Sequence, residues 1–185
     1  SSTFIIAEIG INHEGSYVNA KKMIAAAFKA GADAVKLQIV NADESYDKST
    51  ESYKMFKKAS LNIKQYQKLF NYFNEKKILF ATPGDFESLN MCQKLKVPLY
   101  KISSGLMSNL PLALEISKLK KSMIISTGMA NVKEKNKILK ILKHKNNNNL
   151  ALLHCTSLYP ALLHQTNLNS IRYMHLKYKK IIGYS

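Results

Sequence analysis

Two lysines lie within short apolar runs, where a charged side chain is unexpected. Lys36 lies in DAVKLQ and Lys101 in LYKISSG. Because side chains two positions apart on a strand share a face, Lys36 points the same way as Gln38. Lys101 has the same relation to Ser103. A buried ammonium is costly unless it meets an anion, so the pattern favours a site for phosphate or carboxylate. Two alternatives stay open: lysines that extend past the strand ends to solvent, or a Schiff-base lysine that attacks a carbonyl.

Small hydroxyl side chains recur where further apolar runs end. They are Thr82, Ser104, Ser126 and Ser157. Glycines stand near three of them, at Gly84, Gly105 and Gly128. A phosphate can then approach both hydroxyls and backbone N–H groups. A single such residue is usually an ordinary turn residue, so the recurrence indicates the anion site.

Three other residues are candidates for chemistry or binding. Glu8 ends the first apolar run, where a carboxylate can act as general base or bind a sugar hydroxyl. Tyr159, held in a turn by the following proline, could line a sugar pocket. His154 lies near the end of the sixth run, where a lone histidine is more often structural than a metal ligand. The remaining histidines show no ligand spacing.

The elements that must position these residues alternate along the chain. Seven apolar runs are separated by stretches of helical period, which predicts parallel strands joined by crossover helices. Strands are expected at 3–9, 33–39, 78–83, 98–103, 123–128, 150–155 and 181–185. Helices are expected at 18–30, 62–75, 86–95, 110–119, 132–143 and 168–176. Polar segment 41–60 is long for a connection and is expected to be a loop that covers substrate.

The expected fold is α/β, a (β/α)8 barrel of TIM type that is incomplete, with about seven strands. An open doubly wound sheet would place a glycine-rich phosphate loop after the first strand, and GINHEGS lacks that pattern. Polar strand ends along nearly the whole chain favour a barrel, whose active site lies at the carboxyl ends of the strands. The 185 residues allow one domain, whereas a complete barrel usually needs about 250 residues.

The net charge is +16, and Arg172 is the sole arginine. Lysines spread over the helices indicate solvated faces or a positive field that steers anions. Nucleic-acid binding is disfavoured because aromatic and basic residues are not interleaved. Cys92 and Cys155 lack metal-like spacing and indicate buried thiols in a reducing compartment. No apolar run approaches the roughly 18 residues of a membrane span, and no signal peptide is recognised. A cytoplasmic protein with no membrane partner is expected.

Seven segments stand in the order seen in the sialic acid synthase family. They are AEIGINHEGS, GADAVKLQ, FATPGD, KISSG, IISTGMA, LLHCTSLYP and the terminal GYS. From Phe4 to Ser185 the chain therefore resembles N-acetylneuraminate (sialic acid) synthases, a family that includes legionaminic and pseudaminic acid synthases. The resemblance implies a homodimeric enzyme that condenses phosphoenolpyruvate with an N-acylated amino sugar such as N-acetylmannosamine. Phosphate is released and a nine-carbon 2-keto sugar acid forms. A divalent metal, Mn²⁺ or Mg²⁺, polarises the sugar aldehyde; the phosphoenolpyruvate C3 attacks it, and water adds at C2.

The same resemblance assigns roles to single residues. Lys36 and Lys101 would hold the anionic groups of phosphoenolpyruvate, and Glu8 would be the carboxylate near the reacting centre. Gln38 would lie beside them, and Tyr159 would contact the sugar. The hydroxyls that complete the phosphoenolpyruvate cradle would be Thr82, Ser104, Ser126, Ser157 and Ser185.

The chain also departs from the family pattern. In the family an Asp-His pair follows the segment that ends here at Ser185; that histidine and a later one bind the metal, so no metal ligand is expected in this chain. His13 and His154 are not assigned as replacements. The last barrel strand and the C-terminal antifreeze-like domain are expected outside residues 1–185. Leu106 replaces the carboxylate of the family's SGE or SGD segment. The alternatives are a Schiff-base aldolase of TIM-barrel type and a catalytically dead, anion-binding barrel fragment.

Overall fold

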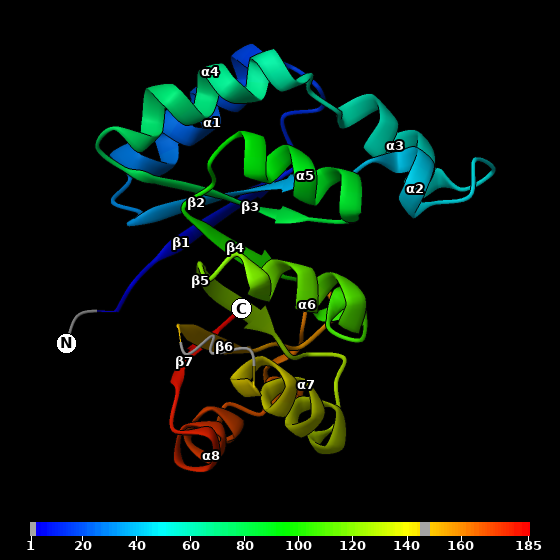
Figure 1. Cartoon of the computed structure of the whole chain (residues 1–185). Coiled ribbons are helices and arrows are strands. Elements are labelled where there is room, and N and C mark those ends of the chain that lie inside the picture. Colours follow the sequence, from blue (N-terminus) through cyan, green and yellow to red (C-terminus); the bar gives the residue numbers. More distant parts are fainter. Residues whose placement is uncertain (1–2, 145–148) are drawn as a thin grey trace. The chain divides into compact units, whose positions relative to one another are not determined.

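The computed structural model describes residues 3–144 and 149–185, which fall into two compact units, Ser1–Pro98 and Leu99–Ser185. Within each unit, strands and helices alternate along the chain (Figure 1).

The first unit contains three parallel strands. They are β1 (Ile6–Gly10), β2 (Ala34–Ile39) and β3 (Ile78–Pro83). The β2 strand pairs with both neighbours, and its interior positions are almost all buried. The helices α1 (Tyr17–Lys29), α4 (Ile63–Asn74) and α5 (Phe86–Lys94) lie on one side of the strands (Figure 1). Apolar side chains of α1 and α4 form the core there, and Ile24 and Leu69 have no exposed surface.

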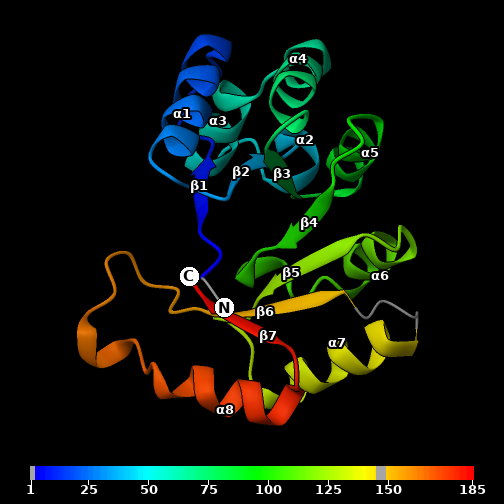
Figure 2. The same cartoon turned by 90° about the vertical axis from the view of Figure 1, so that its left-hand side faces the viewer.

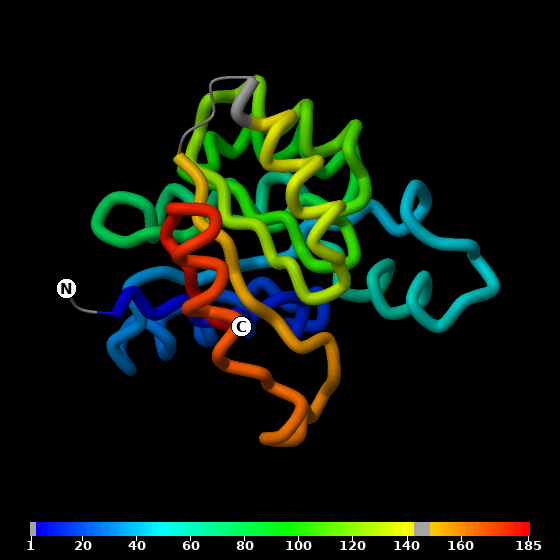
Figure 3. The backbone as a smooth tube through the Cα atoms, turned by 90° about the horizontal axis from the view of Figure 1, so that it is seen from below, coloured from blue at the N-terminus to red at the C-terminus, as the bar shows by residue number. Residues whose placement is uncertain are grey.

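The prediction that segment 41–60 is a loop is wrong, because the segment contains two helices. These are α2 (Ala42–Ser45) and α3 (Glu51–Ala59), drawn in cyan in Figure 3. The side chains of Asn41 and Thr50 accept hydrogen bonds from the first turns of α2 and α3, which satisfies backbone donors there. Tyr46 and Phe56 stack with ring centroids 5.0 Å apart. These contacts fold the segment onto itself.

The second unit contains four parallel strands. They are β4 (Leu99–Ile102), β5 (Ser122–Ser126), β6 (Leu150–His154) and β7 (Ile181–Tyr184). Each pairs with the next strand in sequence order. The helices are α6 (Leu110–Lys118), α7 (Val132–His144) and α8 (Asn169–Tyr178). Single 3-10 turns follow β4, at Ser104–Leu106, and precede α8, at Leu163–Gln165. Figure 2 shows the long connection from β6 to α8 in orange.

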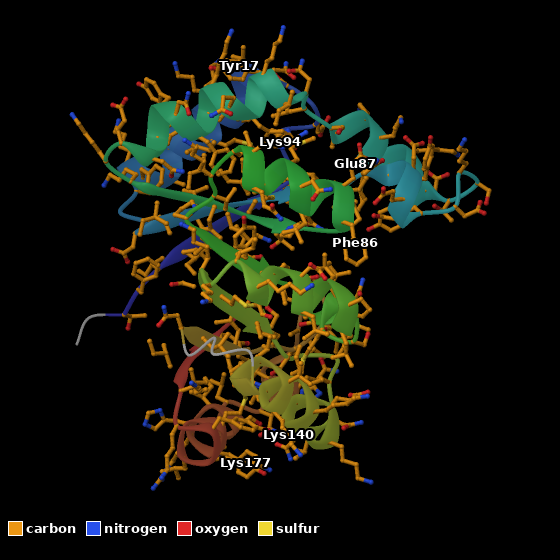
Figure 4. All side chains as sticks on the ribbon, in the orientation of Figure 1. Tyr17, Phe86, Glu87, Lys94, Lys140 and Lys177 are labelled. Atoms are coloured by element: carbon orange, nitrogen blue, oxygen red, sulfur yellow. The ribbon has the colours of Figure 1, made fainter. Side chains whose placement is uncertain are left out.

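The expected positions of strands and helices are confirmed to within a few residues at their ends. The expected solvated helix faces are also present: Figure 4 shows Lys140 of α7 and Lys177 of α8 pointing away from the strands of their unit. Across the described residues, no helix is both long and apolar enough to cross a membrane.

Candidate anion-binding site

The first lysine is buried and paired. Lys36 Nζ lies 3.2 Å from Glu8 Oε2, and the side chains are 6% and 39% exposed, respectively. The register of the parallel strands places Glu8 opposite Lys36, so both side chains lie on one face. The Glu8 carboxylate partly compensates the charge of the Lys36 ammonium. Because Glu8 is partly exposed, the compensating carboxylate is itself accessible.

The next residues along the same face are Gln38 and Thr82, which stand opposite one another at the carboxyl ends of β2 and β3. Thr82 is 1% exposed, and its Oγ1 has no hydrogen-bond partner among the described residues. A buried hydroxyl is rarely left without a partner, because the desolvation penalty is then uncompensated. The Thr82 hydroxyl is therefore a candidate for a hydrogen bond to a ligand.

The second lysine has a similar setting in the other unit. Lys101 is 5% exposed and stands opposite Ile124 in the register between β4 and β5. Ser126 lies two residues beyond Ile124, so it shares the face of Lys101. Ser126 is 2% exposed, and its Oγ lacks a hydrogen-bond partner within the described ranges. Each unit thus places one buried lysine and one unsatisfied hydroxyl on the same face of its strands.

A glycine brings two further predicted serines together. The Gly128 N–H donates a hydrogen bond to Ser104 Oγ over 3.1 Å. A Cβ at position 128 would lie 2.7 Å from Ser157 Oγ and 2.9 Å from the carbonyl oxygen of Cys155. The close approach of Ser157 therefore requires glycine at that position. The glycines that the sequence placed beside the hydroxyls serve packing here as well as backbone access.

The last two predicted residues lie at the open end of the second unit. The Tyr159 ring is 97% exposed and precedes Pro160 through a cis peptide bond. Ser185 is exposed, and its N–H donates to the carbonyl oxygen of His154 over 3.0 Å. Their assigned contacts with sugar and phosphoenolpyruvate stay predictions.

The histidines do not form a metal centre within the described part of the chain. No group of three or more His, Cys, Asp or Glu residues there could hold a metal ion. His154 Nε2 lies 2.7 Å from the carbonyl oxygen of Thr166, which gives it the structural role that was expected. His13 is fully buried; its Nδ1 accepts from the Gly15 N–H at 3.3 Å, and burial lowers its pKa. The described residues therefore do not fit the metal that the resemblance implies.

Two cavities of the second unit differ in their relation to the predicted residues. One of about 280 Å³ lies beside Ser104 and is lined also by Met107, Met129 and Lys137. A larger one, of about 860 Å³, is lined by the amino-terminal ends of β5 and β6 and by residues of α8. Ligands of β/α folds bind at the carboxyl ends of the strands, so the smaller cavity is the one that belongs to the candidate site.

One buried carboxylate, that of Asp85 in the segment FATPGD, is not among the residues predicted from the sequence. Asp85 is 7% exposed and caps α5 by accepting from the Ser88 N–H at 2.7 Å. The signal was an aspartate just before a helical pattern, which is a typical N-cap. Two further hydrogen bonds come from Asn41 and Ser45, which lie 40 or more positions earlier in the chain, and no local pattern reveals these contacts.

Comparison with known proteins places this geometry in a family. The NeuB family profile matches residues 23–185. The chain is 36% identical over 202 residues to the N,N'-diacetyllegionaminic acid synthase of Campylobacter jejuni, covering 99% of this chain and 60% of that protein. It is 32% identical over 201 residues to the N-acetylneuraminate-9-phosphate synthase of Drosophila melanogaster, covering 100% of this chain and 54% of that protein. The chain thus spans little more than half the length of these relatives.

Solved structures agree with the fold. The crystal structure of N-acetylneuraminic acid synthetase from Leptospira borgpetersenii serovar Hardjo-bovis, in complex with citrate, matches with a TM-score of 0.94 at 34% identity. The match covers 100% of this chain and 65% of that chain. It confirms the expected fold class, α/β of the β/α-barrel type, to which the described residues contribute seven parallel strands.

Proposed function

The chain belongs to the NeuB family, and on that premise we propose that the protein joins phosphoenolpyruvate to an N-acylated amino sugar. Its relatives are named as synthases of sialic, legionaminic and pseudaminic acids, which supports a condensation that builds an acidic sugar. In the proposed reaction, C3 of phosphoenolpyruvate forms a bond to the sugar aldehyde carbon, whose oxygen takes up a proton. Water adds at C2, the C2–O bond to phosphorus breaks, and inorganic phosphate leaves with a 2-keto sugar acid as the second product.

The observation that carries the proposal is the pair of buried lysines, each with an unsatisfied hydroxyl on its face. Under the proposal, Lys36 and Lys101 neutralise the carboxylate and phosphate of phosphoenolpyruvate, because a buried ammonium is stabilised by an anion. Thr82 Oγ1 and Ser126 Oγ donate to its oxygens, which would satisfy both hydroxyls. The citrate complex of the Leptospira synthetase shows that a relative binds a small carboxylate.

Glu8 and the remaining residues receive the roles that their positions allow. Glu8, partly exposed beside Lys36, is the proposed acceptor of a hydroxyl or water proton near the reacting carbon. Gln38, Ser104, Ser157, Tyr159 and Ser185 are proposed as further substrate contacts. No step is assigned to the divalent metal, because the described residues offer no ligand set for it. The homodimer and the cytoplasmic location stay predictions.

The first test is a calorimetric titration of the chain with phosphoenolpyruvate, with and without Mn²⁺. We expect binding that does not depend on the metal, since the proposed contacts are lysines and hydroxyls of this chain. The absence of binding under both conditions would contradict the proposed roles of Lys36 and Lys101.

A second test uses the unsatisfied hydroxyls. Thr82→Val and Ser126→Ala should leave the free energy of unfolding unchanged or raise it by about 1 kcal/mol, because an unpaired buried hydroxyl is removed. Each should weaken phosphoenolpyruvate binding about 10-fold, since one hydrogen bond to a charged group is lost. The matched control is Thr127→Val, whose hydroxyl already donates to the Leu153 carbonyl oxygen at 3.0 Å. This control should lose stability and keep its affinity; the opposite pattern would make the two hydroxyls structural.

The Schiff-base alternative makes a different prediction. An aldolase lysine would be trapped covalently by borohydride in the presence of a keto substrate, whereas the condensation proposed here needs no covalent enzyme intermediate. The ion pair of Lys36 with Glu8 stabilises the charged ammonium, which is not the nucleophilic form. Capture at either lysine would overturn the proposed mechanism.

A further inference from the structure

The carboxylate of Asp85 makes two separate sets of hydrogen bonds. Its Oδ1 accepts from the Ser88 N–H at 2.7 Å, which caps α5. Its Oδ2 accepts from the Asn41 N–H at 2.7 Å and from Ser45 Oγ at 3.0 Å, in the chain that follows β2. Ser88 Oγ also donates to Oδ2, at 2.9 Å. Oδ1 therefore caps the helix, and Oδ2 joins the start of the segment 41–60 to the first turn of α5 after β3.

Further contacts join the carboxyl ends of β2 and β3. The Gly84 N–H donates to the carbonyl oxygen of Ile39 at 2.9 Å. A Cβ at Gly84 would lie 2.7 Å from a methyl carbon of Val40, so no larger side chain fits there. Glu87 of α5, labelled in Figure 4, lies against α2: its backbone N–H donates to Glu44 at 3.4 Å. The Asp85 contact is thus the buried centre of a wider junction.

The far end of the segment 41–60 is also held. A Cβ at Gly15 would lie 2.4 Å from the carbonyl oxygen of Lys58, and Lys58 Nζ lies 3.7 Å from Glu14 Oε2. Ile11 packs against the small apolar cluster that includes Val40 and Phe56. The two helices are therefore fixed at one end by the turn after β1 and at the other by Asp85.

The junction borders two predicted substrate contacts. Gln38 precedes Asn41 by three residues, and Thr82 precedes Asp85 by three. The hydrogen bond from the Asn41 N–H to Asp85 holds the chain directly after β2, so its loss shifts Gln38 and the segment 41–60, whereas Thr82 stays in place in β3, whose following helix keeps its Asp85 cap. Asp85 itself is buried, and both of its carboxylate oxygens accept hydrogen bonds from the chain.

We propose that Asp85 is a positioning residue, which orients Gln38 and the segment 41–60 for the amino-sugar substrate and does not itself touch substrate. This inference rests on the proposed function, because the amino sugar is the substrate that the covering segment would meet. The anion contacts through Lys36 and Lys101 lie on other strand positions and do not depend on the tether. The expected signature is a loss of sugar recognition with phosphoenolpyruvate recognition retained.

The test uses Asp85→Asn in the protein at its full natural length. Asparagine is a good N-cap, so its amide oxygen can keep the Ser88 hydrogen bond. Its NH2 group would then face the Asn41 N–H and Ser45 Oγ, so the Asn41 N–H loses its acceptor at Oδ2 and keeps its hydrogen bond to Ser88 Oγ, at 2.9 Å, which weakens the tether. The matched control is Asp33→Asn, since Asp33 also accepts a backbone N–H, that of Ile5 at 2.7 Å, but before β2 begins.

Steady-state rates are measured with N-acetylmannosamine and with an N,N'-diacetylated amino sugar, the two acyl patterns found in the names of the relatives. Asp85→Asn should raise KM for the accepted sugar about 10-fold or more, the size expected when hydrogen bonds to a charged group are lost. KM for phosphoenolpyruvate should stay within about twofold. Hydrogen exchange of amides 41–60 should accelerate in Asp85→Asn and not in Asp33→Asn. Ser45→Ala, which removes one tether bond, should give a smaller change of the same kind.

The outcomes separate this inference from the one it rests on. A wild-type protein that condenses phosphoenolpyruvate with neither sugar would refute the proposed function, and the positioning role with it. If the wild type is active and Asp85→Asn raises KM for the sugar and KM for phosphoenolpyruvate by the same factor, the positioning role alone would be refuted. Unchanged exchange of amides 41–60 in that variant would refute it as well, because the tether would then not hold the segment.

Discussion

The two units of the chain hold their predicted site residues in different ways. In Ser1–Pro98 the strand ends are packed and paired: Lys36 is bound to Glu8, and the segment 41–60 is fixed at both ends. In Leu99–Ser185 the corresponding positions before β6 are buried, but the connection after β6 is open. Tyr159 is 97% exposed there and Leu163 is 92% exposed.

The difference separates site residues that are already ordered in the folded chain from those that a ligand would have to order. Side chains that burial and packing already hold in place need little further ordering when a ligand binds. Lys36 and Thr82 meet that condition, as do Lys101 and Ser126. Tyr159 does not, so ordering its ring on a sugar would cost side-chain entropy that the inner residues have already lost on folding.

The largest expected contrast concerns the two cysteines, one in each unit. Burial raises the pKa of the Cys92 thiol from 9.0 to about 12, which lowers its thiolate fraction at neutral pH about a thousandfold. Cys155 is only half-buried, which corrects the expectation that both thiols are buried; it lies at the rim beyond β6. Iodoacetamide should therefore label Cys155 in the native protein, and Cys92 only after denaturation. Mass spectrometry of the Cys92→Ala and Cys155→Ala variants shows which cysteine is labelled before denaturation and which is labelled after it. Equal labelling rates would show that the first unit opens as readily as the second.

A smaller effect is expected from the two buried lysines, of which each unit supplies one. Lys36→Met and Lys101→Met should each weaken phosphoenolpyruvate binding about 30-fold or more, because truncating one partner of a buried charge pair costs about 2–5 kcal/mol. Lys140→Met, on the outer face of α7, is the control and should bind like the wild type. Calorimetry measures all three. If only one of the two site variants lost affinity, the anion would be held by a single unit.

Much of this arrangement is readable from local patterns. Apolar runs predicted the strands, and the period of two along β2 placed Lys36 and Gln38 on one face. The recurrence of small hydroxyls at strand ends predicted Thr82 and Ser126, which the structure then shows to be buried and unsatisfied. Such positions can be inferred because the pleat of a strand and the carboxyl ends of parallel strands fix side-chain positions within a few residues.

The parts that could not be predicted depend on distant contacts. The helices α2 and α3 are short, and their few apolar residues gain a core only by packing on Val40 and Ile11. The tether of Asp85 to Asn41 joins residues 44 positions apart. The full burial of His13 likewise follows from tertiary packing and not from its polar neighbours in GINHEGS. No periodicity carries that information, because each contact is set by tertiary structure.

The last prediction tests whether the turn after β1 shares the rigidity of its unit. Burial lowers the pKa of His13 from 6.5, so the unfolded chain takes up the proton first as the pH falls. From about pH 7.5 upward the residue is neutral in both states and has no effect; as the pH falls through 6.5, unfolding is favoured increasingly until the folded state is also protonated. The free energy of unfolding should therefore decrease as the pH falls from about 7.5 through 6.5, as measured by urea unfolding with circular dichroism.

His13→Asn should reduce this pH dependence, because an asparagine oxygen can accept from the Gly15 N–H in place of Nδ1 and does not titrate. His164→Asn, at an exposed position after β6, is the matched control and should retain the wild-type slope. An identical slope in wild type and His13→Asn would mean that the turn opens to admit the proton without unfolding. The first unit would then be mobile at the strand end that carries Glu8, and its advantage over the second unit would be confined to β2, β3 and the segment that Asp85 holds.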